Sequence, residues 1–217
     1  MADSKISALT AVAAVVGTHE FAVNEAGASK KATAEQIASF VKSEVAGKTT
    51  LWIPVSQMTP ATTNGPSTAQ LEAATNKENY KVFDFDGTTQ ENAHFQLAIP
   101  KEWDELTITF QAFWATTNTG TAGVAWGLQA YAASDNDTID TAWGTAVYVV
   151  DNGQSSATKL YVSAESGPIT IGGAPAEADL IFFRMHRDPT NGSDNMAEDA
   201  RLIGIKLFYT TNAVNSA

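Results

Sequence analysis

Apolar and polar residues alternate one by one through much of the chain after residue 50, and this alternation restricts the fold more than any other feature. In LTITFQAFW (residues 106–114) every second residue is apolar, and the pattern recurs in VAWGLQAYA (124–132) and KLYVSAE (159–165). Successive side chains of a β-strand point to opposite faces, so this period predicts strands with one buried face. The residues predicted to face a core are Leu106, Ile108, Phe110, Ala112, Trp114, Val124, Trp126, Leu128, Ala130, Ala132, Leu160, Val162 and Ala164.

Further strand-like runs bring the predicted total to about eight to ten. They cover residues 80–85, 93–99, 146–150, 169–171, 180–187 and 201–210. So many strands without intervening long helices predict an antiparallel β-sandwich or barrel, with a jelly roll as the favoured version.

Three segments between these runs do not alternate. Residues 135–144 and 194–200 begin with acidic residues and are predicted to be short capped helices. Residues 60–79 are rich in Thr, Asn, Pro and Ala and are long for a loop in a compact domain. We expect this segment to lie across a neighbouring surface or to form a short helix after Ser67.

The first 50 residues have a different pattern. Residues 19–31 read as a small β-hairpin with a glycine-containing turn. Thr33 precedes Gln36 by three positions, a capping-box spacing that predicts a helix over residues 34–46. Apolar residues on one face of this helix and Gly47 after it agree with that prediction. The whole chain is therefore expected to be mainly β, with an N-terminal hairpin and one helix before the sandwich.

A hairpin and one helix bury little surface. Ordering each residue costs roughly 1 to 2 kcal/mol of backbone entropy, which such a small unit offsets poorly. We place a boundary between residues 47 and 51, giving an N-terminal module over 1–50 and a β domain over 51–217. The module is expected to need a partner surface. Packing on its own C-terminal domain, or disorder, remains the alternative.

Charge and composition exclude several classes of function. The chain has 13 basic and 24 acidic residues, a formal charge of −11, which opposes binding to nucleic acid. It has no cysteine, and so no thiolate chemistry or disulfides. No apolar run reaches the ~20 residues of a membrane span, and no secretory signal is recognisable, so we expect synthesis in the cytosol and no membrane partner.

Catalytic and metal-binding patterns are weak. Residues 135–140 carry three aspartates but fail the EF-hand template at its fifth and sixth positions, so a helix cap is preferred over a calcium site. Asp84 and Asp86 are spaced like a carboxylate pair on one side of a strand, but no second signal supports acid–base catalysis. No cofactor, metal site or enzymatic activity is predicted.

The remaining polar and aromatic candidates have ordinary structural interpretations. His19, His94 and His186 lack metal-ligand spacing and are expected to be polar strand residues. Arg184 and Arg187 beside Asp188, and Asp199 near Arg201, could form surface ion pairs of little energetic value. Aromatic rings can stack on sugars; Trp114 and Trp126 are in phase with the core, whereas Trp52, Trp103 and Tyr131 stay open as sugar-binding candidates.

Two parts of the sequence resemble phage structural proteins. The segments KISALT (5–10), GTHEFAV (17–23) and SKKATAEQI (29–37) resemble the N-terminal attachment module of tailed-bacteriophage head-fibre and tail-fibre proteins. The later segments that resemble a virion-associated β-domain found with phage and prophage structural genes are WIP (52–54), FDFD (83–86), IPKEW (99–103), VAWGLQ (124–129), DLIFF (179–183) and DARLIGIKLFYTT (199–211).

The resemblance implies a virion structural protein of the capsid-decoration or head-fibre type. Its N-terminal module would dock on the major capsid protein or on tail components, and its β-sandwich would project outward, as a homotrimer located in the virion. The residues assigned to attachment are Ile6, Leu9, Phe21, Val23, Ile37, Phe40 and Val41.

Two alternatives stay open. One is a tail-fibre or baseplate protein that binds a receptor or a host-surface glycan, for which the unassigned aromatic residues are the motivation. The other is a polysaccharide depolymerase, which rests on Asp84 and Asp86 alone.

Overall fold

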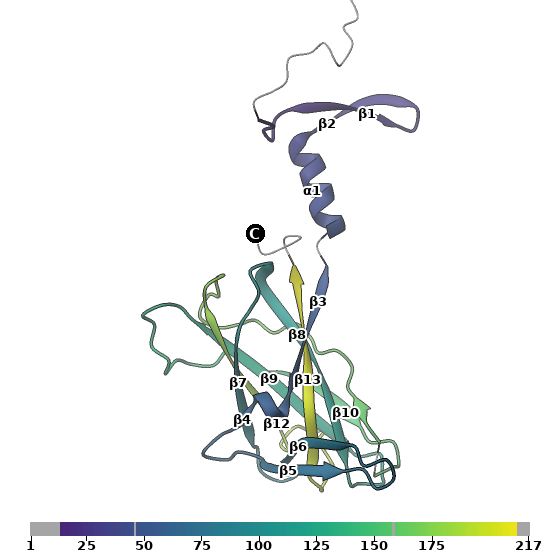
Figure 1. Ribbon diagram of the computed structural model, residues 1–217, viewed down its shortest axis with the longest axis vertical. Coiled ribbons are helices and arrows are strands. Elements are labelled where there is room, and N and C mark those ends of the chain that lie inside the picture. Colours follow the sequence, from purple (N-terminus) through teal and green to yellow (C-terminus); the bar gives the residue numbers. More distant parts are fainter. Residues whose placement is uncertain (1–13, 46, 158, 212–217) are drawn as a thin grey trace, which may run out of the picture. The chain divides into compact units, whose positions relative to one another are not determined.

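A computed structural model describes residues 14–45, 47–157 and 159–211 of the chain. It divides into two compact units, Met1–Ala46 and Gly47–Ala217 (Figure 1). We call them unit 1 and unit 2. The division between residues 46 and 47 lies at the start of the interval 47–51, in which the sequence pattern changes. Ile6 and Leu9, assigned above to attachment, lie outside the described residues.

Unit 1 is a hairpin followed by a helix. Strands β1 (Glu20–Glu25) and β2 (Ala28–Thr33) pair antiparallel, and helix α1 (Ala34–Val45) follows directly. The two turn residues Ala26 and Gly27 both have positive φ, 53° and 84°, as a tight two-residue hairpin turn requires. The capping box is present. Gln36 N donates to Thr33 Oγ1 over 3.1 Å, and Thr33 N donates to Gln36 Oε1 over 2.9 Å, which confirms the predicted helix start.

Unit 2 is an antiparallel β-sandwich, as the alternation predicted. The five-stranded sheet has the order β10 (Val147–Asn152), β9 (Gly123–Ala133), β12 (Leu180–Arg187), β7 (Asn92–Ala98) and β4 (Thr59–Pro60). The six-stranded sheet has the order β11 (Tyr161–Val162), β8 (Trp103–Thr116), β13 (Ala200–Thr211), β6 (Asn79–Phe85) and β5 (Ser67–Glu72), and β3 (Lys48–Pro54) also pairs with β13. A 3-10 turn, Val55–Gln57, follows β3.

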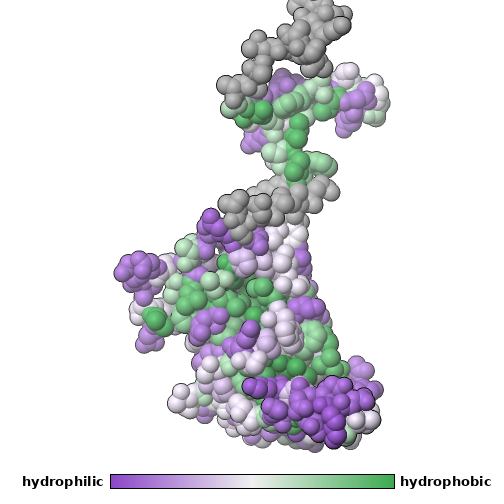
Figure 2. All heavy atoms as spheres, in the orientation of Figure 1, coloured by the Kyte–Doolittle hydropathy of each residue, from purple (hydrophilic) through white to green (hydrophobic). Residues whose placement is uncertain are grey.

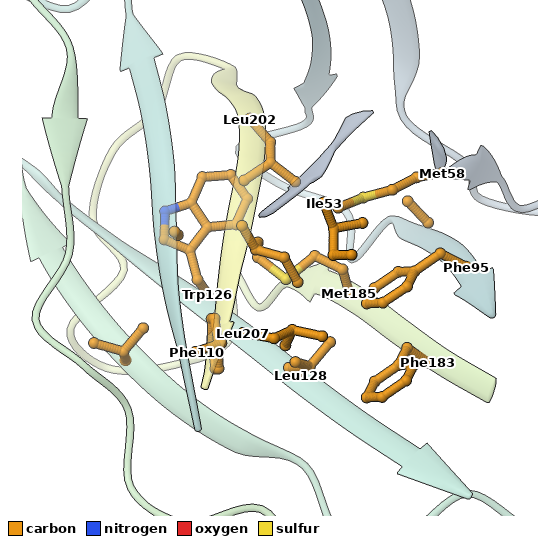
Figure 3. Close-up of a cluster of buried hydrophobic side chains, with 14 of the residues drawn as sticks. Ile53, Met58, Phe95, Phe110, Trp126, Leu128, Phe183, Met185, Leu202 and Leu207 are labelled. Atoms are coloured by element: carbon orange, nitrogen blue, oxygen red, sulfur yellow. The ribbon is translucent and has the colours of Figure 1, made fainter. Parts of the chain in front are cut away.

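The core lies between the two sheets (Figure 3). Phe110, Leu202 and Leu207 come from the six-stranded sheet, and Leu128 and Phe183 from the other. Trp114 and Trp126 are fully buried, as predicted, and their rings meet edge to face with centroids 6.2 Å apart. Trp114 Nε1 donates to Asp151 Oδ2 over 2.8 Å, so its polar atom is satisfied at the rim of the core.

The predicted phase is wrong for Leu106, which is 66% exposed. The cause is local backbone geometry. Glu105 has φ of 60°, and the pairing of β8 with β13 shifts between Tyr209 and Thr211. Such an irregularity interrupts the alternation, so the side chains before Ile108 no longer follow the phase of those after it.

The phase is also wrong around β11. Tyr161 and Ser163 are buried, whereas Leu160 and Val162 are exposed. The Ser163 hydroxyl accepts from Ala112 N over 2.9 Å, and the Ser166 hydroxyl accepts from Phe110 N over 3.0 Å, so both serines replace backbone partners along β8. The Tyr161 ring packs on Trp114 with centroids 4.8 Å apart. The hydrogen bonds of these serines to the β8 backbone therefore determine which side chains of residues 160–166 point into the core.

Neither predicted insertion is helical. Residues 134–146 and 188–199 form turns and extended loops. The acids that looked like helix caps bind elsewhere: Asp137 accepts from Ser134 N, and Asp194 forms an ion pair with the fully buried Arg187. Both carboxylate oxygens of Asp194 accept hydrogen bonds from Arg187: Oδ2 from Nε over 2.9 Å and Oδ1 from Nη2 over 2.8 Å. Arg187 is thus not a surface residue, and it ties the long loop before β13 to the core.

The segment 60–79, which does not alternate in the sequence, contains a strand. Residues 67–72 form strand β5, so the helix predicted after Ser67 is wrong; β5 pairs with β6 along its full length. Residues 169–171, predicted as a strand, contribute one isolated bridge, between Ile169 and Ile108. In the described part of the chain, no helix combines the length and apolar character needed to cross a bilayer.

One edge of β13 is shared by two strands in succession. Leu202 pairs with Phe83 of β6. From Gly204 onward β13 pairs with β3, and this pairing ends at Thr210, which lies opposite Lys48. The change occurs at Ile203, where the register along β8 also shifts. β3 and β6 separate at this point on the six-stranded sheet.

Candidate functional site

The carboxylates singled out from the sequence do not form a catalytic pair. Asp84 accepts from Arg201 Nε over 3.2 Å, and burial raises its pKa despite that cation. Asp86 accepts from the hydroxyl and the amide of Thr88, and these hydrogen bonds lower its pKa. Each carboxylate is engaged in its own local structure. Arg201 pairs with Asp84, so the partner predicted for it, Asp199, is wrong.

Among the described residues, no three or more His, Asp or Glu side chains gather where they could hold a metal ion. His186 is buried against Tyr148, whose hydroxyl lies 3.2 Å from its Nε2. His94 stacks on Trp143 with centroids 5.5 Å apart. His186 thus packs against a ring of strand β10 and His94 against a ring of the loop before it, and the buried His186 is not the ordinary polar strand residue expected.

The three unassigned aromatic residues separate clearly. Trp103 and Tyr131 are buried, at 3% and 4% exposure, so they belong to the interior. Trp52 is 45% exposed. Of the sugar-binding candidates, therefore, Trp52 alone presents a large part of its ring to solvent.

Trp52 borders the largest of four described surface hollows, with a volume of about 770 Å³, over the outer face of the six-stranded sheet. The hollow lies where β3 and β6 separate along β13, since its walls come from these strands and from β8. Its lining residues are Trp52, Ala73, Glu78, Tyr80, Phe113, Ala115, Lys159, Leu160, Ile203 and Lys206. Tyr80, at 36% exposure, provides a second accessible ring.

The position of Trp52 follows from the strands around it. Alternation in β3 turns Ile53 into the core and Trp52 outward. The indole meets Phe113 edge to face, with centroids 5.0 Å apart and planes at 81°. It also lies over Gly204, where an added Cβ would come 2.7 Å from two ring atoms. A glycine at this position lets the ring settle against the sheet.

Two smaller hollows continue the first. One of about 430 Å³ shares Trp52, Tyr80 and Ile203 with it, and adds Pro54, Val55, Ser56 and Lys81. The next, of about 380 Å³, shares Val55, Ser56 and Lys81 with the second. We call the three hollows together the Trp52 groove. Successive hollows that share walls suit an extended ligand.

The sequence carried a signal for part of this groove. Phe113 stands on the otherwise polar face of LTITFQAFW, beside Thr107, Thr109 and Gln111. A large ring out of phase with its strand indicates a surface role for Phe113. Tyr80, Lys159 and Lys206 had no such signal, because the strands and loops that bring them together are far apart in the sequence.

Unit 1 presents a separate apolar surface. Of the residues assigned to attachment, the five described ones are all exposed: Phe21, Val23, Ile37, Phe40 and Val41. Val23, Ile37 and Phe40 line a hollow of about 400 Å³ between the hairpin and α1. Figure 2 shows hydrophobic residues along α1 and the hairpin within this unit.

Comparison with known proteins gives only distant similarities. No protein-family model and no curated protein matches the sequence. Among solved structures, the chain is similar to part of a Clostridium thermocellum xylanase 10B chain that comprises CBM22-1 and GH10 modules and was solved with xylohexaose, at 8% identity and a TM-score of 0.43. That match covers 72% of this chain but 27% of the xylanase chain, so this chain spans about a quarter of that protein's length.

Two further structures show the same degree of likeness. A family 11 carbohydrate-binding module from Clostridium thermocellum, in complex with a β-1,3-1,4-mixed-linked tetrasaccharide, is 11% identical, with 74% of this chain and 95% of the module covered and a TM-score of 0.40. The Shewanella oneidensis MR-1 protein SO2946, of unknown function, is 11% identical, with 83% and 96% covered and a TM-score of 0.32. Similarity at this level assigns no ligand and no family to the chain.

Proposed function

We propose that this chain is a non-catalytic carbohydrate-binding protein that holds a glycan in the Trp52 groove. The observation that carries the proposal is the pair of accessible rings, Trp52 and Tyr80, at the shared wall of two hollows. The C–H face of a pyranose packs against an aromatic ring as other apolar surfaces do. Concave sites with aromatic walls and a few polar groups are the usual form of small-ligand sites.

The test is binding of the full chain to an array of soluble polysaccharides, followed by titration calorimetry on those retained. Trp52→Ala is expected to weaken binding about tenfold or more, because it removes the exposed stacking surface. Leu106→Ala removes a more exposed apolar side chain from the same sheet, outside the groove, and should bind like the wild type. Equal binding by Trp52→Ala and wild type would show that the groove is not the site.

A second candidate function is attachment to a virion surface through unit 1. It is supported by the exposed apolar residues Phe21, Val23, Ile37, Phe40 and Val41, together with the resemblance to phage attachment modules. Apolar residues concentrated in so small a unit are suited to burial against other subunits. A homotrimer would let three such anchors act together, and a protein of this kind could present a glycan-binding sandwich outward.

Co-sedimentation with tailed-phage particles from the encoding strain tests this second function. The double variant Ile37→Asp and Val41→Asp should abolish co-sedimentation, since it places two charges in the exposed apolar surface. Ser39→Asp adds a charge to the same helix and serves as the control. Light scattering on the free chain tests the trimer. Particles that retain the double variant as well as the wild type would contradict attachment through unit 1.

A further inference from the structure

The lysines of this chain divide into two groups. Eight have described side chains, and five of these form ion pairs with glutamates: Lys30 with Glu25, Lys31 with Glu20, Lys48 with Glu165, Lys77 with Glu72 and Lys101 with Glu177. Within the described part of the chain, the other three make no ion pair. They are Lys81, Lys159 and Lys206, and all three line the Trp52 groove.

This distribution is unexpected for a chain of net charge −11, in which acidic partners outnumber basic residues almost two to one. Among the described lining residues, the groove carries one carboxylate, Glu78, against the three lysines. Cations left without acidic partners in a concave site attract anionic groups of a ligand.

Lys206 is the best positioned of the three. It lies directly opposite Trp52 in the pairing of β13 with β3, so the two side chains share one face of the sheet. Its ammonium lies 5.7 Å from the centroid of Phe113 and 5.8 Å from that of Phe208. Aromatic rings hold the charge in place, while leaving its hydrogen-bond donors available for a ligand.

We propose that the glycan bound in the Trp52 groove is an acidic polysaccharide, whose sugar rings stack on Trp52 and whose carboxylates pair with Lys206, Lys159 and Lys81. The inference rests on the proposed function and adds the chemical class of its ligand. The net charge of −11 opposes every polyanion, so the attraction must come from the local lysines of the groove, and a single-stranded nucleic acid is one outcome of the test below.

Polygalacturonate and its methyl ester provide a matched pair of probes, since they differ at the carboxyl group alone, which is charged in the first and a neutral methyl ester in the second. The full chain is expected to bind polygalacturonate about tenfold more tightly than the ester at low salt, and the preference should shrink as salt rises. Lys206→Gln should lower affinity for polygalacturonate about three- to fivefold and leave affinity for the ester unchanged. Lys101→Gln, which removes a lysine paired with Glu177, should keep the preference.

Every outcome is decisive. If the wild type binds the ester or a neutral β-glucan as tightly as polygalacturonate, the proposed function stands and the acidic specificity is overturned. If a single-stranded DNA oligomer binds as tightly as polygalacturonate, the groove is a general polyanion site and the inference fails. If no polysaccharide binds at all, the proposed function itself fails.

Discussion

The indole of Trp52 lies over Gly204, and a methyl group at Gly204 would come within 2.7 Å of the ring atoms Cη2 and Cζ2. The same methyl group would lie 2.7 Å from the backbone oxygen of Ile53, so the ring cannot absorb the whole displacement. The orientation of the Trp52 ring is therefore set by a residue on the neighbouring strand.

Gly204→Ala is expected to weaken glycan binding and to lower the free energy of unfolding by about 1 to 3 kcal/mol, because the added methyl group overpacks the contact with Trp52. Urea denaturation and calorimetry measure the two effects. At Gly192 nothing lies within 4 Å of an added Cβ, so Gly192→Ala is the matched control. Unchanged binding and stability in Gly204→Ala would mean that the ring is free to move without cost.

Arg187→Met is expected to lower the free energy of unfolding of unit 2 by about 3 to 5 kcal/mol. The substitution leaves Asp194 buried without its cation, and it removes the donors to the backbone oxygens of Glu198 and Phe85. Lys101→Met breaks an exposed pair and should change stability by less than about 1 kcal/mol. Equal denaturation midpoints for the two variants would contradict the buried role of Arg187.

His186 makes stability depend on pH. Burial, with the nearby Arg184 charge, lowers its pKa from 6.5 to about 4, while Asp188 acts in the opposite direction. Between pH 4 and pH 6.5 the unfolded state binds the proton and the folded state does not. The contribution of neutral His186 to stability is therefore fully present above a pH of about 6.5 and is lost as the pH falls toward 4. His186→Gln should flatten this part of the stability curve. A wild-type curve as flat as that of the variant would contradict the pKa shift.

Thr33→Ala is expected to cost about 1 kcal/mol of helix stability, since it removes the acceptor of the Gln36 amide. The helical circular dichroism of the full chain should fall, because the described part of the structure contains one α-helix. Thr33→Ser keeps the hydroxyl and should retain the signal. Loss of signal in the serine variant as well would indicate that the threonine methyl group, not the cap, is required.

The strands were predictable because alternation is a local property. Residues 180–187 were predicted as a strand and form β12 over the same bounds, and the helix after Thr33 follows from its capping box. The failures come from partners distant in the sequence. Asp194 looked like a helix cap, but it binds Arg187, and Leu160 looked buried, but Ser163 and Tyr161 satisfy β8 in its place.

The groove could be predicted only in part. Trp52 is a candidate from the sequence because no strand pattern determines its environment, whereas Phe113 breaks the alternation of its strand and is not among the predicted site residues. Lys206 and Tyr80 join the site because β13 exchanges one neighbour for another at Ile203. Such an exchange depends on strand order, which no local pattern specifies.

The pairing of β3 with β13 places the first and last strands of the sandwich side by side, with Lys48 opposite Thr210 (Figure 1). The polypeptide therefore enters and leaves this domain at a single point. A recombination event that replaces everything before Lys48 would exchange the N-terminal unit and preserve the Trp52 groove. The architecture thus allows this β-sandwich to be joined to different N-terminal segments without change to its own strands.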